Sequence, residues 1–261
     1  MTAGWTGRAA IERWSQIPHD VLDEMEPAGD FDKRHLLNPV LLEMLGDVAG
    51  RRILDAGCGH GYSSRMLAAR GADVTAVEPA AGLFAYALHK EQELRQGITY
   101  VEADLTQTLD FGAPFDAVVC SMVLSAIPDW RSTMRTCVRS AQLGGIIVIA
   151  INHPAFEQLR GTWREHGEYR VRRYLDEYEI AGRYAPDFHR PLSAYLNELA
   201  APGCRLREVA EPGLNVAVAS KAALAAPGID GYVHLPNFLV ISAESPAIAP
   251  GRPSSSDKGG R

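Results

Sequence analysis

The stretch ILDAGCGHG, residues 53–61, places three glycines directly after a short apolar run. The run favours a buried strand, and the pattern over 62–70, closed by Gly71, favours a helix that follows it. Glycines at such a junction let the backbone approach a ligand closely, while the free N–H groups of the first helical turn point towards that ligand. The stretch therefore predicts a strand–turn–helix unit that binds a nucleotide-like cofactor, as the first such turn of a doubly wound sheet often does.

Strand and helix patterns alternate on the C-terminal side of this unit. Such alternation indicates βαβ units and a largely parallel sheet, whose strands are apolar throughout because helices cover both faces. Two later strand patterns bring the expected sheet to seven strands. The predicted fold class is therefore α/β, with a doubly wound, mostly parallel sheet. The strand patterns cover 51–56, 73–78, 98–104, 115–121, 144–151, 205–211 and 237–244.

The rest of the chain divides by composition. We expect a helical N-terminal cap over 1–50, a main domain over 51–246, and a tail over 247–261 whose composition is typical of disorder. Residues 152–187 are rich in Arg, Glu, Tyr and Trp with weak periodicity, which predicts a lid-like insertion over the sheet edge. The Ala-, Gly- and Pro-rich segment 212–236 is predicted to be a loop.

Charge and cysteine content narrow the function classes. The chain has 261 residues, a formal net charge of −6 and four cysteines. It shows no run of Lys and Arg for nucleic acid, no apolar run that could span a bilayer, no signal-peptide core and no metal-ligand spacing. We therefore expect a cytoplasmic monomer or homodimer that acts on a small molecule, without nucleic acid, membrane or metal.

The spacing of acids and glycines indicates which cofactor binds. Glu78 ends the second strand pattern about twenty residues after the glycines, where an acid can accept hydrogen bonds from ribose hydroxyls. A dinucleotide fingerprint, however, needs GxGxxG, and counting from Gly57 the last position holds Tyr62. Asp55, directly before the turn, also suits a cationic amine better than a phosphate. An adenosine-containing cofactor without a pyrophosphate fits this pattern best.

Together these motifs resemble those of the class I S-adenosylmethionine-dependent methyltransferases, whose first motif reads much like LDxGCGxG. The resemblance is strongest over 35–150 and looser over FHRPLSAYLNEL, residues 188–199, and the last two strands. It implies a Rossmann-like sheet with an antiparallel last strand. It also implies an enzyme that transfers a methyl group from S-adenosyl-L-methionine to a small molecule.

The resemblance further implies which residues contact the cofactor. Gly57, Cys58 and Gly59 would line its methionine and ribose parts, and Asp55 would reach its amino group. Glu78 would hold the ribose hydroxyls. Asp104 would meet the adenine amino group, or could instead be a helix or turn cap. Cys58 and Cys120 could instead be small buried residues without a chemical role. The full predicted cofactor set is Asp55, Gly57, Cys58, Gly59, Gly61, Glu78, Ala80, Asp104, Leu105, Cys120 and Ser121.

Two histidines are candidate general bases, because an imidazole titrates near neutral pH. His153 follows the fifth strand at the carboxyl edge where ligands bind, and His189 lies in FHRP. Each could instead be a structural residue at the end of a strand or helix. Asn152, Tyr169 and Arg190 are candidate substrate-binding residues. The insertion's aromatic residues could cover the substrate or anchor the insertion to the sheet.

The main functional hypothesis is methylation of an O, N or C atom of a small molecule, with secondary metabolism as one setting. An NAD(P)-dependent oxidoreductase is the first alternative, but the third glycine of the fingerprint is missing. A non-catalytic S-adenosylmethionine-binding protein is the second alternative. The glycines and the ribose acid that such a protein could lose are all present in this chain.

Overall fold

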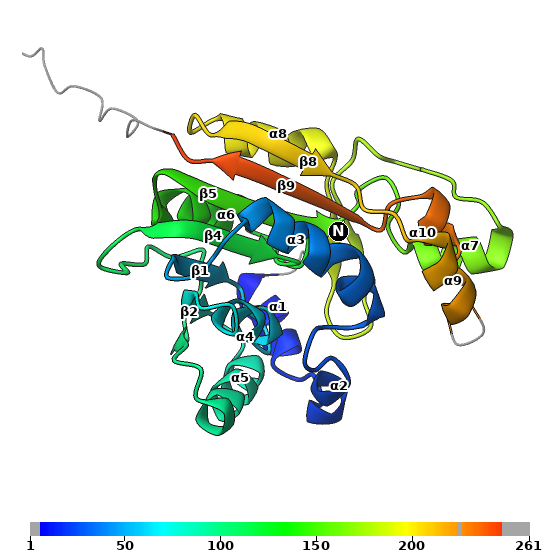
Figure 1. Cartoon of the computed structure of the whole chain (residues 1–261). Helices are drawn as coiled ribbons and strands as arrows, with labels where there is room; N and C mark the ends of the chain where they lie inside the picture. The colour runs from blue at the N-terminus through cyan, green and yellow to red at the C-terminus, as the bar shows by residue number, and fades with distance from the viewer. Residues whose placement is uncertain (1–5, 224–225, 247–261) are drawn as a thin grey trace, which may run out of the picture.

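A computed structural model of the chain describes residues 6–223 and 226–246. Within them, a seven-stranded sheet runs in the order β3-β2-β1-β4-β5-β9-β8 (Figure 1). The strands β1 to β5 pair in parallel, and β9 is antiparallel to both β5 and β8. This confirms the predicted doubly wound, mostly parallel sheet with an antiparallel last strand. The strands are β1 (Arg52–Ala56), β2 (Asp73–Val77), β3 (Thr99–Val101), β4 (Phe115–Ser121), β5 (Ala141–Asn152), β8 (Arg205–Ala210) and β9 (Phe238–Glu244).

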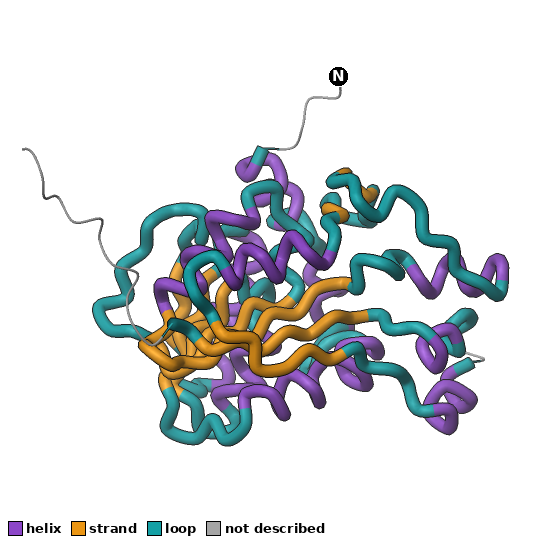
Figure 2. Tube along the Cα trace, turned by 90° about the horizontal axis from the view of Figure 1, so that it is seen from above, coloured by secondary structure: helices purple, strands orange, loops and turns teal. Residues whose placement is uncertain are grey.

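Helices cover both faces of the sheet (Figure 2). Successive residues of β1 enter different apolar clusters, Ile53 on one face and Leu54 on the other. Because each strand buries both faces, its sequence is apolar without alternation. The helices α3 (Asn38–Leu45) and α4 (Tyr62–Ala68) pack on the first face, whereas α6 (Trp130–Ser140) and α8 (Leu192–Ala200) pack on the second.

The N-terminal segment lies against the first half of the sheet. Its helices α1 (Gly7–Trp14) and α2 (His19–Glu24) and the short π-helix η1 (Lys33–Leu37) precede α3. Ile17 and Leu22 pack with Leu83 of α5 (Ala81–Leu94). The approach is close, because a Cβ at Gly82 would overlap the carbonyl oxygen of Ser15. Arg13 Nε also donates to the carbonyl oxygen of Tyr184 at 3.0 Å, which joins α1 to the insertion.

Three short helices gather at one end of the molecule (Figure 1). They are α7 (Leu159–His166), α9 (Val216–Ala222) and α10 (Gly231–His234), so the prediction that 212–236 is a loop was wrong. Trp163 of α7 packs against Gly231, and its Nε1 donates to Asp230 Oδ2 at 3.0 Å. This packing stabilises helices too short to show a periodic pattern.

The insertion carries a small two-stranded sheet, β6 (Tyr178–Ile180) with β7 (Asp187–His189). The N–H of Phe188 donates to the carbonyl oxygen of Ser125 at 2.7 Å, so β7 lies against the loop after β4. The helix α3 ends at Leu45 and is capped by Gly46. The tail predicted over 247–261 lies outside the described residues. Within the described residues, no helix is long and apolar enough to cross a membrane.

Candidate functional site

A cavity of about 310 Å³ opens at the carboxyl ends of the parallel strands. Residues at or after the ends of β1, β2, β4 and β5 line it, and the N-terminal segment covers it with Ile11, Trp14 and Ile17. This is the edge where open α/β sheets bind their ligands. The apolar cover keeps water away from whatever lies beneath it.

The glycine turn gives the cavity its floor. Gly57 has φ of 83°, and a Cβ there would overlap the side chain of Val123, so only glycine fits. Gly59, with φ of 57°, has no atom within 4 Å of the position a Cβ would take. The backbone at Gly59 is therefore free to contact a ligand directly.

Glu78 fixes the turn and faces the cavity. Its Oε2 accepts the N–H of Gly59 at 2.9 Å, and its Oε1 accepts the N–H of Ala80 at 2.8 Å. Burial nevertheless raises the pKa of Glu78 to about 7. Each carboxylate oxygen can accept a further hydrogen bond, which suits a ligand with two neighbouring hydroxyls.

Asp55, at the end of β1, has less capacity than Glu78 to accept a hydrogen bond from a ligand. Its Oδ2 accepts the hydroxyl of Ser64 at 2.6 Å, and burial raises the pKa of Asp55 to about 6. The Cys58 thiol beside it is also buried, which raises its pKa well above the usual range. Cys58 is therefore a wall of the cavity and is not activated as a nucleophile.

Four polar atoms of the lining have no hydrogen-bond partner within the described part of the chain: Trp14 Nε1, His60 Nε2, Ser63 Oγ and Ser121 Oγ. Of these, His60 Nε2 lies 3.6 Å from Glu26 Oε1. Burial, helped by the Arg65 charge, lowers the pKa of His60 to about 3, so its ring is neutral. Buried polar atoms are nearly always hydrogen-bonded in folded proteins. These four atoms therefore indicate that the cavity binds a ligand with polar groups.

The one cationic side chain among the described lining residues is Lys33 of η1. Its Nζ lies 2.5 Å from Asp30 Oδ2. Burial alone would raise the pKa of Asp30, but the contact with Lys33 outweighs burial and the pKa is lowered. Lys33 can bind a carboxylate at this end of the cavity. Within the described residues, no group of three or more His, Cys, Asp or Glu side chains could hold a metal ion.

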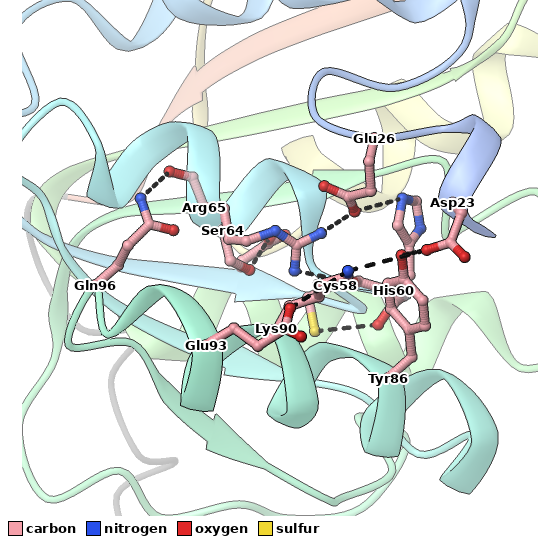
Figure 3. A network of polar contacts seen from close by, with 12 residues as sticks. Asp23, Glu26, Cys58, His60, Ser64, Arg65, Tyr86, Lys90, Glu93 and Gln96 are labelled. Carbon is pink, nitrogen blue, oxygen red and sulfur yellow. Dashed lines mark hydrogen bonds and ion pairs between the residues drawn. The ribbon is translucent and has the colours of Figure 1, made fainter. Parts of the chain in front are cut away.

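A polar network fastens the N-terminal segment to the glycine turn (Figure 3). Arg65 donates from Nη1 to the carbonyl oxygen of His60 at 2.9 Å and from Nη2 to Glu26. On the other side, the hydroxyl of Tyr86 donates to Asp23 Oδ1 at 2.6 Å. The N-terminal segment is thus joined to the glycine turn by an ion pair and to α5 by a hydrogen bond to a carboxylate.

Comparison with known proteins agrees with this geometry. Residues 54–149 match the family described as a methyltransferase domain. Over 147 residues the chain is 31% identical to a ubiquinone biosynthesis O-methyltransferase of Alkalilimnicola ehrlichii, a match that covers 54% of this chain and 56% of the relative. The chain thus spans about half the length of such relatives.

Solved structures share the fold over more of the chain. An S-adenosylmethionine-dependent methyltransferase from Mesorhizobium loti is similar with a TM-score of 0.67 and 27% identity, covering 79% of this chain and 96% of that one. Over residues 54–149 this chain carries a methyltransferase domain, and its fold is that of S-adenosylmethionine-dependent methyltransferases. The fold also extends to a magnesium protoporphyrin IX methyltransferase from Synechocystis PCC 6803 solved with bound SAM, at a TM-score of 0.58 and 15% identity over 94% of this chain and 99% of that one.

Most of the cofactor residues predicted for this methyltransferase line the cavity, but Gly61 and Cys120 do not. Gly61 is the N-cap of α4, where it lies against Tyr100 and Arg65. Cys120 is fully buried beside Cys137, in the apolar cluster under α6. Asp104 lines the cavity and also caps a turn, because its Oδ1 accepts the N–H of Thr106 at 2.9 Å.

The two candidate bases of the methyltransferase lie outside the lining. His153 Nδ1 accepts the N–H of Ala155 at 3.1 Å, so the proton is on Nε2, which donates to Glu211 Oε1 at 2.6 Å. His189 Nε2 faces the carbonyl oxygen of Tyr174 at 2.9 Å, and its Nδ1 lies 2.9 Å from Glu157 Oε2. Neither ring presents a free nitrogen to the cavity, and their catalytic role stays a prediction.

Of the predicted substrate residues of the methyltransferase, Asn152 lines the cavity whereas Tyr169 and Arg190 do not. The Tyr169 hydroxyl donates to the carbonyl oxygen of Glu157 at 2.7 Å. Arg190 is buried and donates to the carbonyl oxygens of Leu124 and Ile127 at 2.6 and 2.8 Å, so it supports the loop after β4.

Sequence reasoning missed Lys33 and Asp187 of this methyltransferase, which both line the cavity. Lys33 lies in a π-helical turn, and Asp187 lies in the insertion, where no motif marks either residue. One signal for Asp187 was available. Asp187 stands two residues before His189 in a strand, and alternate residues of a strand share a face.

Proposed function

We propose that this methyltransferase transfers the methyl group of S-adenosyl-L-methionine to a small-molecule acceptor. One observation carries the proposal. The glycine turn and Glu78 form one hydrogen-bonded unit on the floor of the cavity, at the edge where such sheets bind cofactors.

The lining residues fit this cofactor. Glu78 would hold the ribose hydroxyls, because both of its oxygens retain acceptor capacity. His60 Nε2 and Ser121 Oγ would each gain a hydrogen-bond partner, and Lys33 would bind the carboxylate of the methionine part. In this proposal Ala80, Asp104 and Leu105 surround the adenine, and Asp55 is close to the amino group.

Bound S-adenosylmethionine supplies an activated methyl group on a sulfonium, so the protein's main task is to position the acceptor. The loop after β4, which Arg190 supports, forms one wall for that acceptor. Ile11, Trp14 and Ile17 exclude water above it.

We further propose that the acceptor atom is an oxygen. The relatives that match over about half of their length are named O-methyltransferases. Methylation on N or C, the cytoplasmic location and the monomeric or dimeric state stay predictions from the sequence.

Isothermal titration tests the cofactor assignment. We expect S-adenosylhomocysteine and S-adenosylmethionine to bind the protein and NAD to give no heat. An exposed control variant, Asp110→Asn, should bind all three ligands as the wild type does. Tight binding of NAD together with no heat from S-adenosylhomocysteine would refute the proposal in favour of an oxidoreductase.

A further inference from the structure

The cavity extends past the cofactor residues towards β5 and the insertion. Asn152, at the end of β5, and Asp187, in β7, line this part, together with the loop after β4. The hydrogen bond from the N–H of Phe188 to the carbonyl oxygen of Ser125 holds β7 in place. Since Glu78 and Asp104 lie on the opposite side, after β2 and β3, this part is left for the acceptor.

Asp187 differs from every other carboxylate that lines the cavity. Asp55 accepts the Ser64 hydroxyl, Glu78 accepts two backbone N–H groups, Asp104 accepts the N–H of Thr106, and Asp129 accepts the N–H of Ser132 as the N-cap of α6. Within residues 6–223 and 226–246, the Asp187 carboxylate has no side-chain hydrogen bond and no ion pair. A partly buried carboxylate that lines a cavity and has no protein partner is free to accept a hydrogen bond from a ligand.

The electrostatic surroundings restrict the charge of that ligand. Burial raises the pKa of Asp187 to about 6. The nearby titratable groups are Glu157, which repels a second negative charge, and its partners His189 and Tyr178, while Asp129 adds another carboxylate to the same wall. Lys33, the cation of the described lining, belongs to the N-terminal segment. An anionic acceptor is therefore disfavoured beside Asp187, and a neutral hydrogen-bond donor is favoured.

We propose that Asp187 binds the hydroxyl group of a neutral acceptor and takes its proton during methylation, an inference that rests on the proposed function. The acceptor oxygen forms a bond to the methyl carbon while the carbon–sulfur bond of S-adenosylmethionine breaks. The electron pair of the broken bond stays on sulfur, and the proton of the acceptor moves to an oxygen of Asp187. The acceptor class is thus a phenol or alcohol without a carboxylate or phosphate near the reacting hydroxyl.

The test uses catechol as the probe and its dimethyl ether, 1,2-dimethoxybenzene, which has no hydroxyl group to donate. Both are titrated into the full chain saturated with S-adenosylhomocysteine. We expect catechol to bind about tenfold more tightly than the dimethyl ether, as loss of one charged hydrogen bond predicts. In Asp187→Asn this preference should shrink to less than about threefold, while affinity for S-adenosylhomocysteine stays within about twofold.

A matched control is Asp176→Asn, which removes the same charge from an exposed ion pair with Arg173 in the same insertion. It should retain the wild-type preference for catechol. A second measurement does not depend on turnover. In protein with ¹³C-labelled aspartate, the carboxyl resonance missing from Asp187→Asn should titrate with a midpoint of about 6, and catechol should lower that midpoint.

The possible outcomes separate the two proposals. A wild type that does not bind S-adenosylhomocysteine would refute the proposed function. A wild type that binds it but shows no preference for catechol would refute the acceptor class. An Asp187→Asn variant that keeps the preference would refute the role of Asp187.

Discussion

At the scale of single residues, buried carboxylates determine the properties of this cavity. Glu78 combines two backbone hydrogen bonds with an exposed fraction of only 6%. It therefore shapes the glycine turn and keeps acceptor capacity for a ligand at the same time. Asp55 has given one oxygen to Ser64, and Asp187 has kept both of its oxygens free.

Replacing Glu78 by Ala should weaken S-adenosylhomocysteine binding by roughly 1–3 kcal/mol, because the buried ribose acceptors would be lost. Isothermal titration at pH 8 measures this directly. The exposed variant Glu102→Ala, beside β3, serves as the control and should leave the affinity unchanged. Unchanged affinity in Glu78→Ala would remove the assigned ribose role.

Arg190 makes a contrasting prediction, since it contacts backbone and not the cavity. Arg190→Ala should lower the free energy of unfolding by about 3 kcal/mol, because three carbonyl oxygens of the loop after β4 would lose their donor. Thermal unfolding of the ligand-free protein is the measurement. A variant with wild-type stability but weaker acceptor binding would instead support the substrate-binding role that the sequence predicted.

At the scale of elements, the position of the N-terminal segment depends on the surface of α5. The carbonyl oxygen of Ser15 occupies the space that a side chain at Gly82 would need. Leu22 and Ile17 then reach Leu83, and the cover of the cavity rests on this contact. Alanine normally suits a helix better than glycine, but at Gly82, the second residue of α5, the contact with Ser15 leaves no room for a side chain.

We expect Gly82→Ala to displace the N-terminal segment and to weaken S-adenosylhomocysteine binding about tenfold or more. Limited proteolysis should then cut the segment 15–28 faster than in the wild type. The matched control is Gly161→Ala in α7, where no atom lies within 4 Å of the added Cβ. That variant should be stabilised by up to about 1 kcal/mol. Equal behaviour of the two variants would contradict the close contact between Ser15 and α5.

The helices and strands also differ in how far they could be predicted from the sequence. The strands were recognisable because both of their faces are buried, and the turn at Gly57 because only glycine fits there. The helices α9 and α10 were not recognisable, because packing around Trp163 stabilises them and their own sequences show no helical periodicity. Glu78 could be found by its spacing from the glycines, whereas Asp187 could not, because a lone carboxylate in an irregular insertion belongs to no motif. His153 and His189 were chosen for their chemistry, yet their ring nitrogens face carboxylates and backbone.

At the scale of the whole molecule, the raised pKa values make the stability of the ligand-free protein depend on pH. The pKa of Glu78 rises from 4.5 to about 7 on folding. The folded state therefore binds more protons than the unfolded state between these values, so this stabilisation is complete below pH 4.5 and is lost as pH rises to about 7. Asp55 acts in the same direction up to about pH 6.

Glu78→Gln should flatten this dependence. Between pH 5 and 7.5 the loss of unfolding free energy should be smaller in the variant than in the wild type, by on the order of 1–3 kcal/mol. Urea unfolding at a series of pH values gives the comparison. Parallel curves for the two proteins would contradict the assignment of a raised pKa to Glu78.

The hydrogen bond between Arg13 and the carbonyl oxygen of Tyr184 has a kinetic consequence. It joins α1, which covers the cavity, to the segment that leads into β7 of the acceptor wall. We expect this bond to couple the two sides, so that a bound acceptor product keeps α1 in place over the spent cofactor. We therefore expect an ordered release, in which the methylated product leaves first and S-adenosylhomocysteine leaves last. In steady-state inhibition experiments, S-adenosylhomocysteine should then compete with S-adenosylmethionine, whereas the methylated product should not.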